Sequence, residues 1–76
     1  MNDARRKTLY IARDLMDQAM TIISDCRDEE QDAFDAMPEG LQETERGEAM
    51  EENVSNMEDI LDEIDRLMEL LDEVTE

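Results

Sequence analysis

The sequence has no histidine, no tryptophan and only one cysteine among its 76 residues. Without histidine, the zinc and di-iron sites of helical proteins lack their usual ligand. The single Cys26 excludes a disulfide within the chain and agrees with a reducing compartment, and it has no histidine to activate it as a nucleophile. We therefore expect a protein that is not an enzyme and has no catalytic residue, metal or cofactor.

Long apolar runs are also missing. No run approaches the ~18 residues of a membrane span, and the N-terminus, although basic at Arg5, Arg6 and Lys7, lacks the apolar region of a signal peptide. We expect a cytoplasmic protein with no membrane partner.

Positive charge is scarce, since seven Lys and Arg face twenty-four Asp and Glu, for a formal net charge of −17. Nucleic acid and anionic membranes would repel such a chain, whereas a basic protein surface would attract it. A chain of this size rarely buries a core worth more than ~3–5 kcal/mol, so it needs a disulfide, a metal or another chain. Because the first two are excluded, we expect association with a second copy.

The apolar residues that are present recur in steps of three and four in the second half of the chain, the pattern of a packed helix. This row consists of Gly47, Met50, Val54, Met57, Leu61, Ile64, Met68 and Leu71. A second row, at seven-residue spacing, consists of Ile60, Leu67 and Val74. A two-stranded coiled coil needs only the first row, so the extra row predicts a bundle of three or four helices.

The first half carries a similar row, made of Leu9, Ala12, Met16, Ala19, Ile23, Cys26, Glu30, Ala33 and Met37. Leu15 and Ile22 flank this row on one side, and Met20 and Phe34 on the other. We expect Cys26 to be buried and inert. Glu30 is a carboxylate on an apolar row, so we expect it to meet Arg27, Arg46 or solvent.

These rows predict a single domain, 1–76, with helices over 3–37 and 44–74 and a turn at 38–43. Asn2 or Asp3 is a suitable N-cap for the first helix and Thr44 for the second. Because the connection is short, the helices should be antiparallel neighbours. The predicted fold is therefore all-α, an antiparallel, coiled-coil-like helical hairpin that dimerises into a four-helix bundle.

Two residues of the turn act as helix breakers. Pro38 disfavours helical backbone at Met37, and Gly40 permits a turn with positive φ. Leu41 is placed to fold back as a hydrophobic staple or onto Phe34.

The expected oligomer interface draws apolar residues from both helices. It comprises Met16, Ile23, Met57, Ile60, Leu61, Ile64, Leu67, Met68, Leu71 and Val74.

A bundle of two such hairpins would be about 50 Å long at ~1.5 Å per residue. With −17 on each copy, it would carry roughly one negative charge per 1.5 Å, against about one per 1.7 Å in duplex DNA. Such a rod suits a basic groove that normally binds nucleic acid. The acids expected to bind a basic partner are Asp28, Asp32, Asp35, Glu39, Glu43, Glu45, Glu48, Glu51, Glu52 and Glu58.

The stretch from Glu29 to Glu51, with the pattern EEQ…F…PExLQxxERGExME, covers about a third of the chain. It resembles a group of small acidic helical proteins of unassigned function that phages, prophages and mobile elements encode. The resemblance implies a helical hairpin and a location in the host cell cytosol. Together with the charge, it suggests a DNA mimic that inhibits or modulates a basic, nucleic-acid-binding host or defence protein.

Three alternatives remain. The acidic faces are explained equally by ordinary solvation, and the chain by a self-assembling coiled-coil scaffold. More distantly, Glu48 with Glu51, and Glu69 with Asp72, are similar to the Mg-binding helices of all-α nucleotide pyrophosphatases. All four lie on one predicted helix, however, whereas a metal site needs acids that converge from facing helices.

Overall fold

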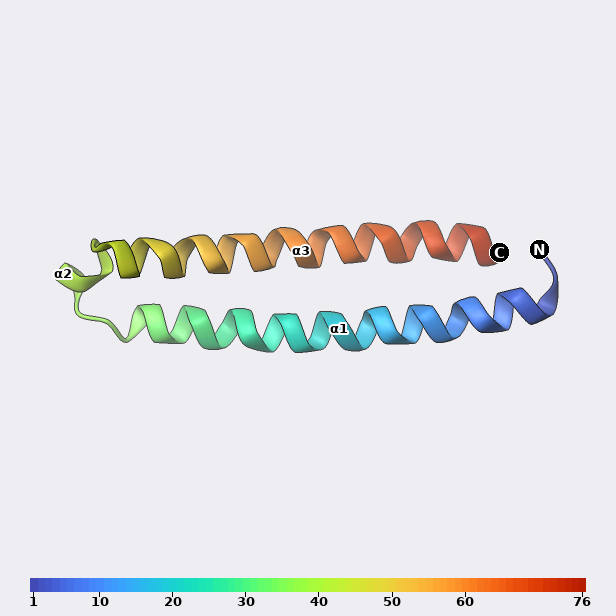
Figure 1. The fold of residues 1–76 in the computed structure, drawn as a ribbon, viewed down its shortest axis with the longest axis horizontal. Helices are drawn as coiled ribbons and strands as arrows, with labels where there is room; N and C mark the ends of the chain where they lie inside the picture. The colour runs from blue at the N-terminus through green and yellow to red at the C-terminus, as the bar shows by residue number, and fades with distance from the viewer.

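The computed structural model describes all residues, 1–76, and confirms that the chain is all-helical. Its helices are α1 (Asp3–Asp35), α2 (Glu39–Gln42) and α3 (Glu45–Thr75). α1 and α3 lie side by side and run in opposite directions, with α2 at one end and both termini at the other (Figure 1). The Cα atoms extend over 58 × 15 × 13 Å, so the molecule is a rod.

Both long helices begin at a polar cap. The side-chain oxygen of Asn2 accepts the Arg5 N–H at 2.9 Å, and that of Thr44 accepts the Gly47 N–H at 3.4 Å. Each bond satisfies a backbone donor that has no partner inside the helix. α1 ends at Asp35 rather than at residue 37, and α3 continues to Thr75 rather than ending at residue 74.

The connection over residues 38–43, which was expected to be a turn, contains one turn of helix, α2. The N–H groups of Leu41 and Gln42 both donate to the Pro38 carbonyl, at 2.8 and 3.2 Å. This leaves Gly40 with helical backbone, and the expectation of a positive φ there is wrong. Leu41 does not become buried and remains 50% exposed. Gln42 instead ties the connection to the end of α1, donating through Nε2 to the carbonyls of Phe34 and Met37.

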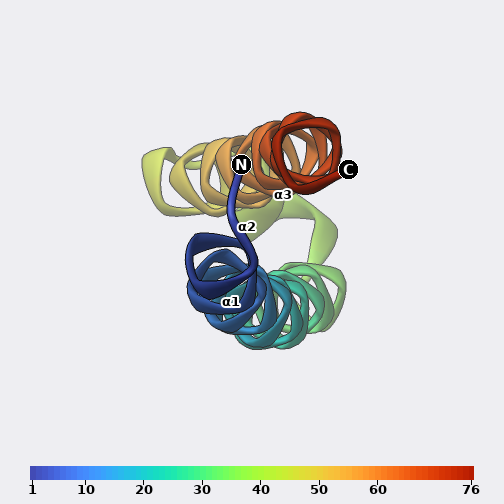
Figure 2. The same ribbon diagram turned by 90° about the vertical axis from the view of Figure 1, so that its right-hand side faces the viewer.

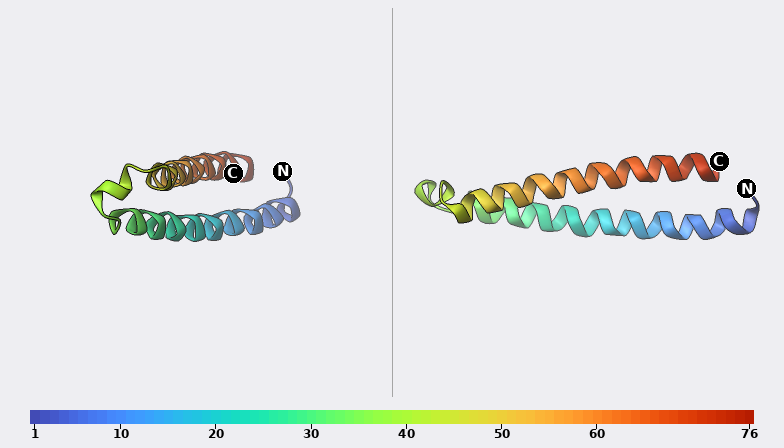
Figure 3. Two further views of the ribbon diagram at one scale, coloured as in Figure 1. Left: turned by 60° about the vertical axis from the view of Figure 1, so that its left-hand side comes forward. Right: turned by 45° about the horizontal axis from the view of Figure 1, so that its top comes forward.

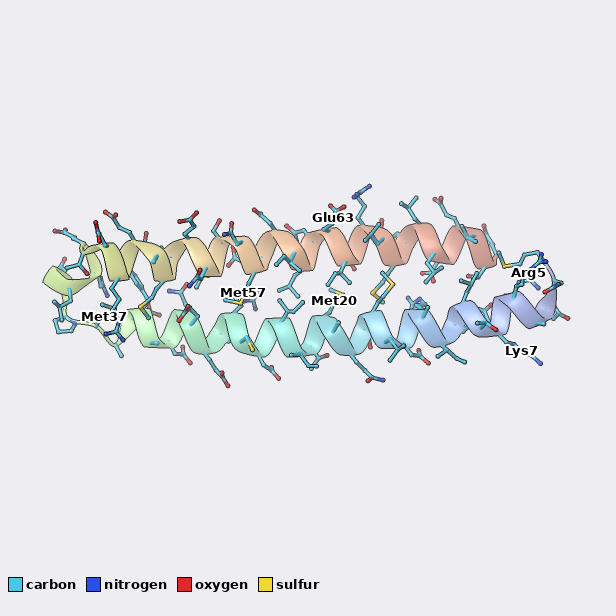
Figure 4. All side chains as sticks on the ribbon, in the orientation of Figure 1. Arg5, Lys7, Met20, Met37, Met57 and Glu63 are labelled. Carbon is cyan, nitrogen blue, oxygen red and sulfur yellow. The ribbon has the colours of Figure 1, made fainter.

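α3 faces α1 along one row. Every seventh residue of this row is buried, and those between are half-buried; the buried set is Gly47, Val54, Leu61, Met68 and Thr75. Met57 and Met20 point into the space between the helices (Figure 4). The end-on view shows the two helices inclined to one another rather than strictly parallel (Figure 2).

The inward row of α1 departs from the one expected. Cys26 and Ala33 are exposed, while their neighbours Arg27 and Phe34 are half-buried. In a straight helix, residues at seven-residue spacing fall behind by about 20° per heptad. The row that includes Cys26 and Ala33 therefore turns away from α3, and the prediction of a buried Cys26 is wrong.

Glu30 is half-buried and meets neither of the two arginines expected. It accepts a hydrogen bond of 2.9 Å from the side-chain amide of Asn53, across the two helices. Arg27 pairs with the adjacent Asp28 instead. A neutral donor on α3 thus satisfies the carboxylate.

Candidate interaction surfaces

The packing of α1 on α3 leaves a long flank on each side of the rod (Figure 3). Two contacts between the helices identify them. On one side, Asn53 donates to Glu30, and Cys26 and Glu29 line a shallow hollow with Asn56. On the other side, Arg13 forms an ion pair with Asp72, in which Nε lies 2.6 Å from Oδ1.

The side that carries Cys26 has no charged residue between Thr8 and Cys26 of α1 or in the row from Asn53 to Val74 of α3, although toward the connection it carries Glu29, Glu30 and Arg46. At 3.6 residues per turn, this side of α1 carries Thr8, Ile11, Ala12, Leu15, Ala19, Ile22 and Cys26, and this side of α3 carries Asn53, Asn56, Ile60, Leu67 and Val74. We call these residues the uncharged flank. Its large side chains are strongly exposed, from 40% at Leu67 to 64% at Ile22.

The residues expected at an oligomer interface fall into two groups. Ile60, Leu67 and Val74 lie on the uncharged flank and face outward in the single chain. The others lie between α1 and α3: Met16, Ile23, Met57, Leu61, Ile64, Met68 and Leu71. Ile11, Leu15 and Ile22 of this flank were not among the expected interface residues, although their spacing of four and seven residues placed them on one side of a helix.

The opposite side is acidic. Here α3 carries a row of carboxylates at seven-residue spacing, Glu51, Glu58, Asp65 and Asp72, and α1 carries Asp17, Asp28 and Asp35. We call these residues the acidic flank. The acidic row and the uncharged row of α3 lie on opposite sides of the helix, and each repeats every seven residues.

All ten acids expected to bind a partner are exposed. Asp28, Asp35, Glu51 and Glu58 belong to the acidic flank, and Glu39 and Glu43 lie in and beside α2. The remaining four, Asp32, Glu45, Glu48 and Glu52, point further outward or toward other sides of the rod. Asp17, Asp65 and Asp72 of the acidic flank were not among the ten expected acids, because the sides of two helices that adjoin depend on how the helices pack.

Few of the carboxylates are neutralised. The ion pairs are Arg6–Asp3, Arg13–Asp72, Arg27–Asp28 and Arg66–Glu63. The hydrogen bond from Arg66, with its positive charge, holds the pKa of Glu63 below its usual value. The hydrogen bond to Asp72 likewise raises the pKa of Arg13. Glu63 itself points away from α1 (Figure 4).

No three carboxylate or thiol groups converge in a way that could hold a metal ion. No helix is long and apolar enough to cross a membrane. No protein-family model, curated protein or solved structure matches this chain.

Proposed function

We propose that this chain is an acidic, non-enzymatic interaction module. In this proposal it is a helical hairpin that pairs with a second copy into a four-helix bundle. It binds a basic, nucleic-acid-binding host or defence protein by charge mimicry. The resemblance of residues 29–51 to small phage and mobile-element proteins supports the setting of an inhibitor or modulator in the host cytosol.

The observation that carries this proposal is the acidic flank. Its α3 row repeats a carboxylate about every 10 Å along a nearly straight helix, at ~1.5 Å per residue. Within that row only Asp72 forms an ion pair. Exposed charges of one sign on a stiff support attract a basic protein from a distance and align it on contact.

The proposal is tested by reversing charge on one side of α3 at a time. The variant Glu51→Lys/Glu58→Lys/Asp65→Lys changes the acidic flank. Its matched control, Asp59→Lys/Glu63→Lys/Glu73→Lys, makes the same change in net charge on the outer side of the same helix, at acids that were not expected to bind the partner. Each is immobilised, exposed to a bacterial lysate and washed with increasing salt, and bound proteins are identified by mass spectrometry.

We expect the natural chain and the control to retain a basic protein in stoichiometric amount, which salt or duplex DNA releases. The acidic-flank variant should lose at least about nine tenths of it, since several charge contacts of ~0.2–1 kcal/mol each become repulsive. Equal capture by the two variants, or a captured protein that DNA does not displace, would contradict charge mimicry.

The uncharged flank favours a second candidate, a self-assembling scaffold whose only specific contact is with itself. A scaffold would return only its own chain from the lysate, and both variants would behave alike.

A further inference from the structure

The exposed apolar side chains of the uncharged flank form a ladder across the two helices. The contacts of Arg13 with Asp72 and of Glu30 with Asn53 set the register between α1 and α3. In this register Ile22 lies near the level of Ile60, Leu15 near Leu67, and Ile11 near Val74. The ladder is continuous, and between Thr8 and Cys26 its α1 side has no charged residue.

Resting on the proposed pairing of two copies, we propose that the uncharged flank binds the same flank of a second copy. We further propose that the two rods pack head to tail, with the connection of one beside the termini of the other.

The absence of charge points to a second copy as the occupant. Two chains of −17 repel one another wherever their carboxylates meet, and this flank is the side where they do not. A basic partner would instead be drawn to the acidic flank on the opposite side. The two surfaces therefore suit two different partners.

The uncharged flank covers about 27 Å of the rod at ~1.5 Å per residue and is about 15 Å wide, so it offers roughly 400 Å². Each partner of a stable complex contributes ~800 Å², so residues beyond the ends of the flank must also take part in the contact. The single chain also leaves its interior open, since the buried hydrophobic residues are only Val54, Leu61 and Met68, and none of them is completely covered. A second copy on the uncharged flank would cover the space between α1 and α3 on that side.

The charges at the ends of the flank set the direction. Toward the termini, Arg5 lines a hollow with Ala4 and Thr8, and toward the connection, Glu29 lines a hollow with Cys26. Residue 17 lies midway between Arg5 and Glu29, and it also lies midway between Thr8 and Cys26, the ends of the uncharged stretch. A head-to-tail pair aligned on this centre therefore brings Arg5 of each copy to Glu29 of the other. Packing in the same direction would instead place the acidic connections side by side.

In such a dimer the two acidic flanks face outward on opposite sides. One bundle would then present two equivalent surfaces to basic partners.

The only cysteine of the chain provides a direct test, because Cys26 is exposed at one end of the flank. In head-to-tail packing, Cys26 of one copy lies at the level of Thr8 of the other. The two Cys26 residues are then about 27 Å apart along the rod, at ~1.5 Å per residue. Pulsed electron paramagnetic resonance of the nitroxide-labelled natural chain should give a distance of roughly 25–35 Å. A distance below about 15 Å would overturn the head-to-tail direction.

A charge swap tests the same contact in a different way, by sedimentation equilibrium. Arg5→Glu should weaken the dimer roughly tenfold more than Lys7→Glu, which makes the same charge change at a side chain that points away from α3 (Figure 4). Adding Glu29→Arg to Arg5→Glu should restore the dimer. Failure of this rescue in variants that keep their helical circular dichroism would contradict the contact.

Disulfide cross-linking completes the test. Under mild oxidation the variant Leu15→Cys/Cys26→Ser, near the centre of the flank, should form a covalent dimer, whereas the natural Cys26 should not. A chain that remains monomeric at tens of micromolar would overturn the assignment of the flank to a second copy. Capture of a basic protein by the acidic flank is measured separately, so either proposal can fail while the other stands.

Discussion

Gly47 sits where α3 begins and is the one glycine whose missing side chain the structure requires. A Cβ at this position would overlap the backbone carbonyl of Gln42 and lie 2.7 Å from its Cα. Because Gln42 also binds the end of α1 through two backbone carbonyls, Gly47 lets α3, the connection and α1 meet at one point. Gly40, by contrast, has nothing within 4 Å of an added Cβ.

These two glycines make a matched pair for mutation. Gly47→Ala should destabilise the protein by about 1–3 kcal/mol, because backbone atoms must move to make room. Gly40→Ala should stabilise it by about 0.5–1 kcal/mol, because alanine loses less backbone entropy in a helical conformation. Urea unfolding followed by circular dichroism measures both, and equal effects of the two substitutions would show that the contact with Gln42 is not restrictive.

At the scale of the helix, α3 carries several rows with different properties, each repeating every seven residues. Leu61 and Met68 belong to the buried row, Ile60 and Leu67 to the uncharged flank, and the acidic row lies on the other side. The same heptad therefore specifies a core, an apolar surface and a charged surface.

The inner row of α3 could be predicted from sequence because large apolar residues mark it without ambiguity. α1 was harder, since Ala19 next to Met20 and Ala33 next to Phe34 offer two rows of similar polarity. Only the packing decides between them, and it places Phe34 inward and leaves Ala33 exposed. The apolar rows of the uncharged flank could be found on each helix separately, but which side of α1 adjoins which side of α3 could not be predicted, because it depends on the packing and on the register that Arg13 and Asp72 define.

Replacing one leucine on each side of α3 tests this division of the helix. Leu61 is 9% exposed and Leu70 is 46% exposed. Leu61→Ala should cost about 2–3 kcal/mol, through lost burial and the cavity it leaves, and Leu70→Ala less than about 1 kcal/mol. Thermal or urea unfolding gives both values. A cost at Leu70 as large as that at Leu61 would mean that the outer side of α3 is also covered.

At the scale of the whole molecule, the dominant feature is uncompensated negative charge. Four ion pairs are distributed over a chain with a net charge of −17. Repulsion among the remaining carboxylates opposes both the approach of α1 to α3 and the pairing of two copies.

Salt should therefore act with opposite signs on folding and on partner binding. Raising sodium chloride from about 10 mM to about 150 mM shortens the screening length from ~30 to ~8 Å. We expect Tm to rise by about 5 °C, corresponding to roughly 1 kcal/mol for a chain of this size. Over the same range, capture of a basic protein should weaken. Differential scanning calorimetry measures the first effect, and a Tm that falls with salt would mean that the ion pairs outweigh the repulsion.

Both ends of the chain emerge together at the end of the rod remote from α2 (Figure 1). A bead, surface or fused domain attached through either terminus would therefore hold a single copy by the same end of the rod and leave α2 at the free end. Tethering through the amino end and through the carboxyl end should then give interchangeable reagents.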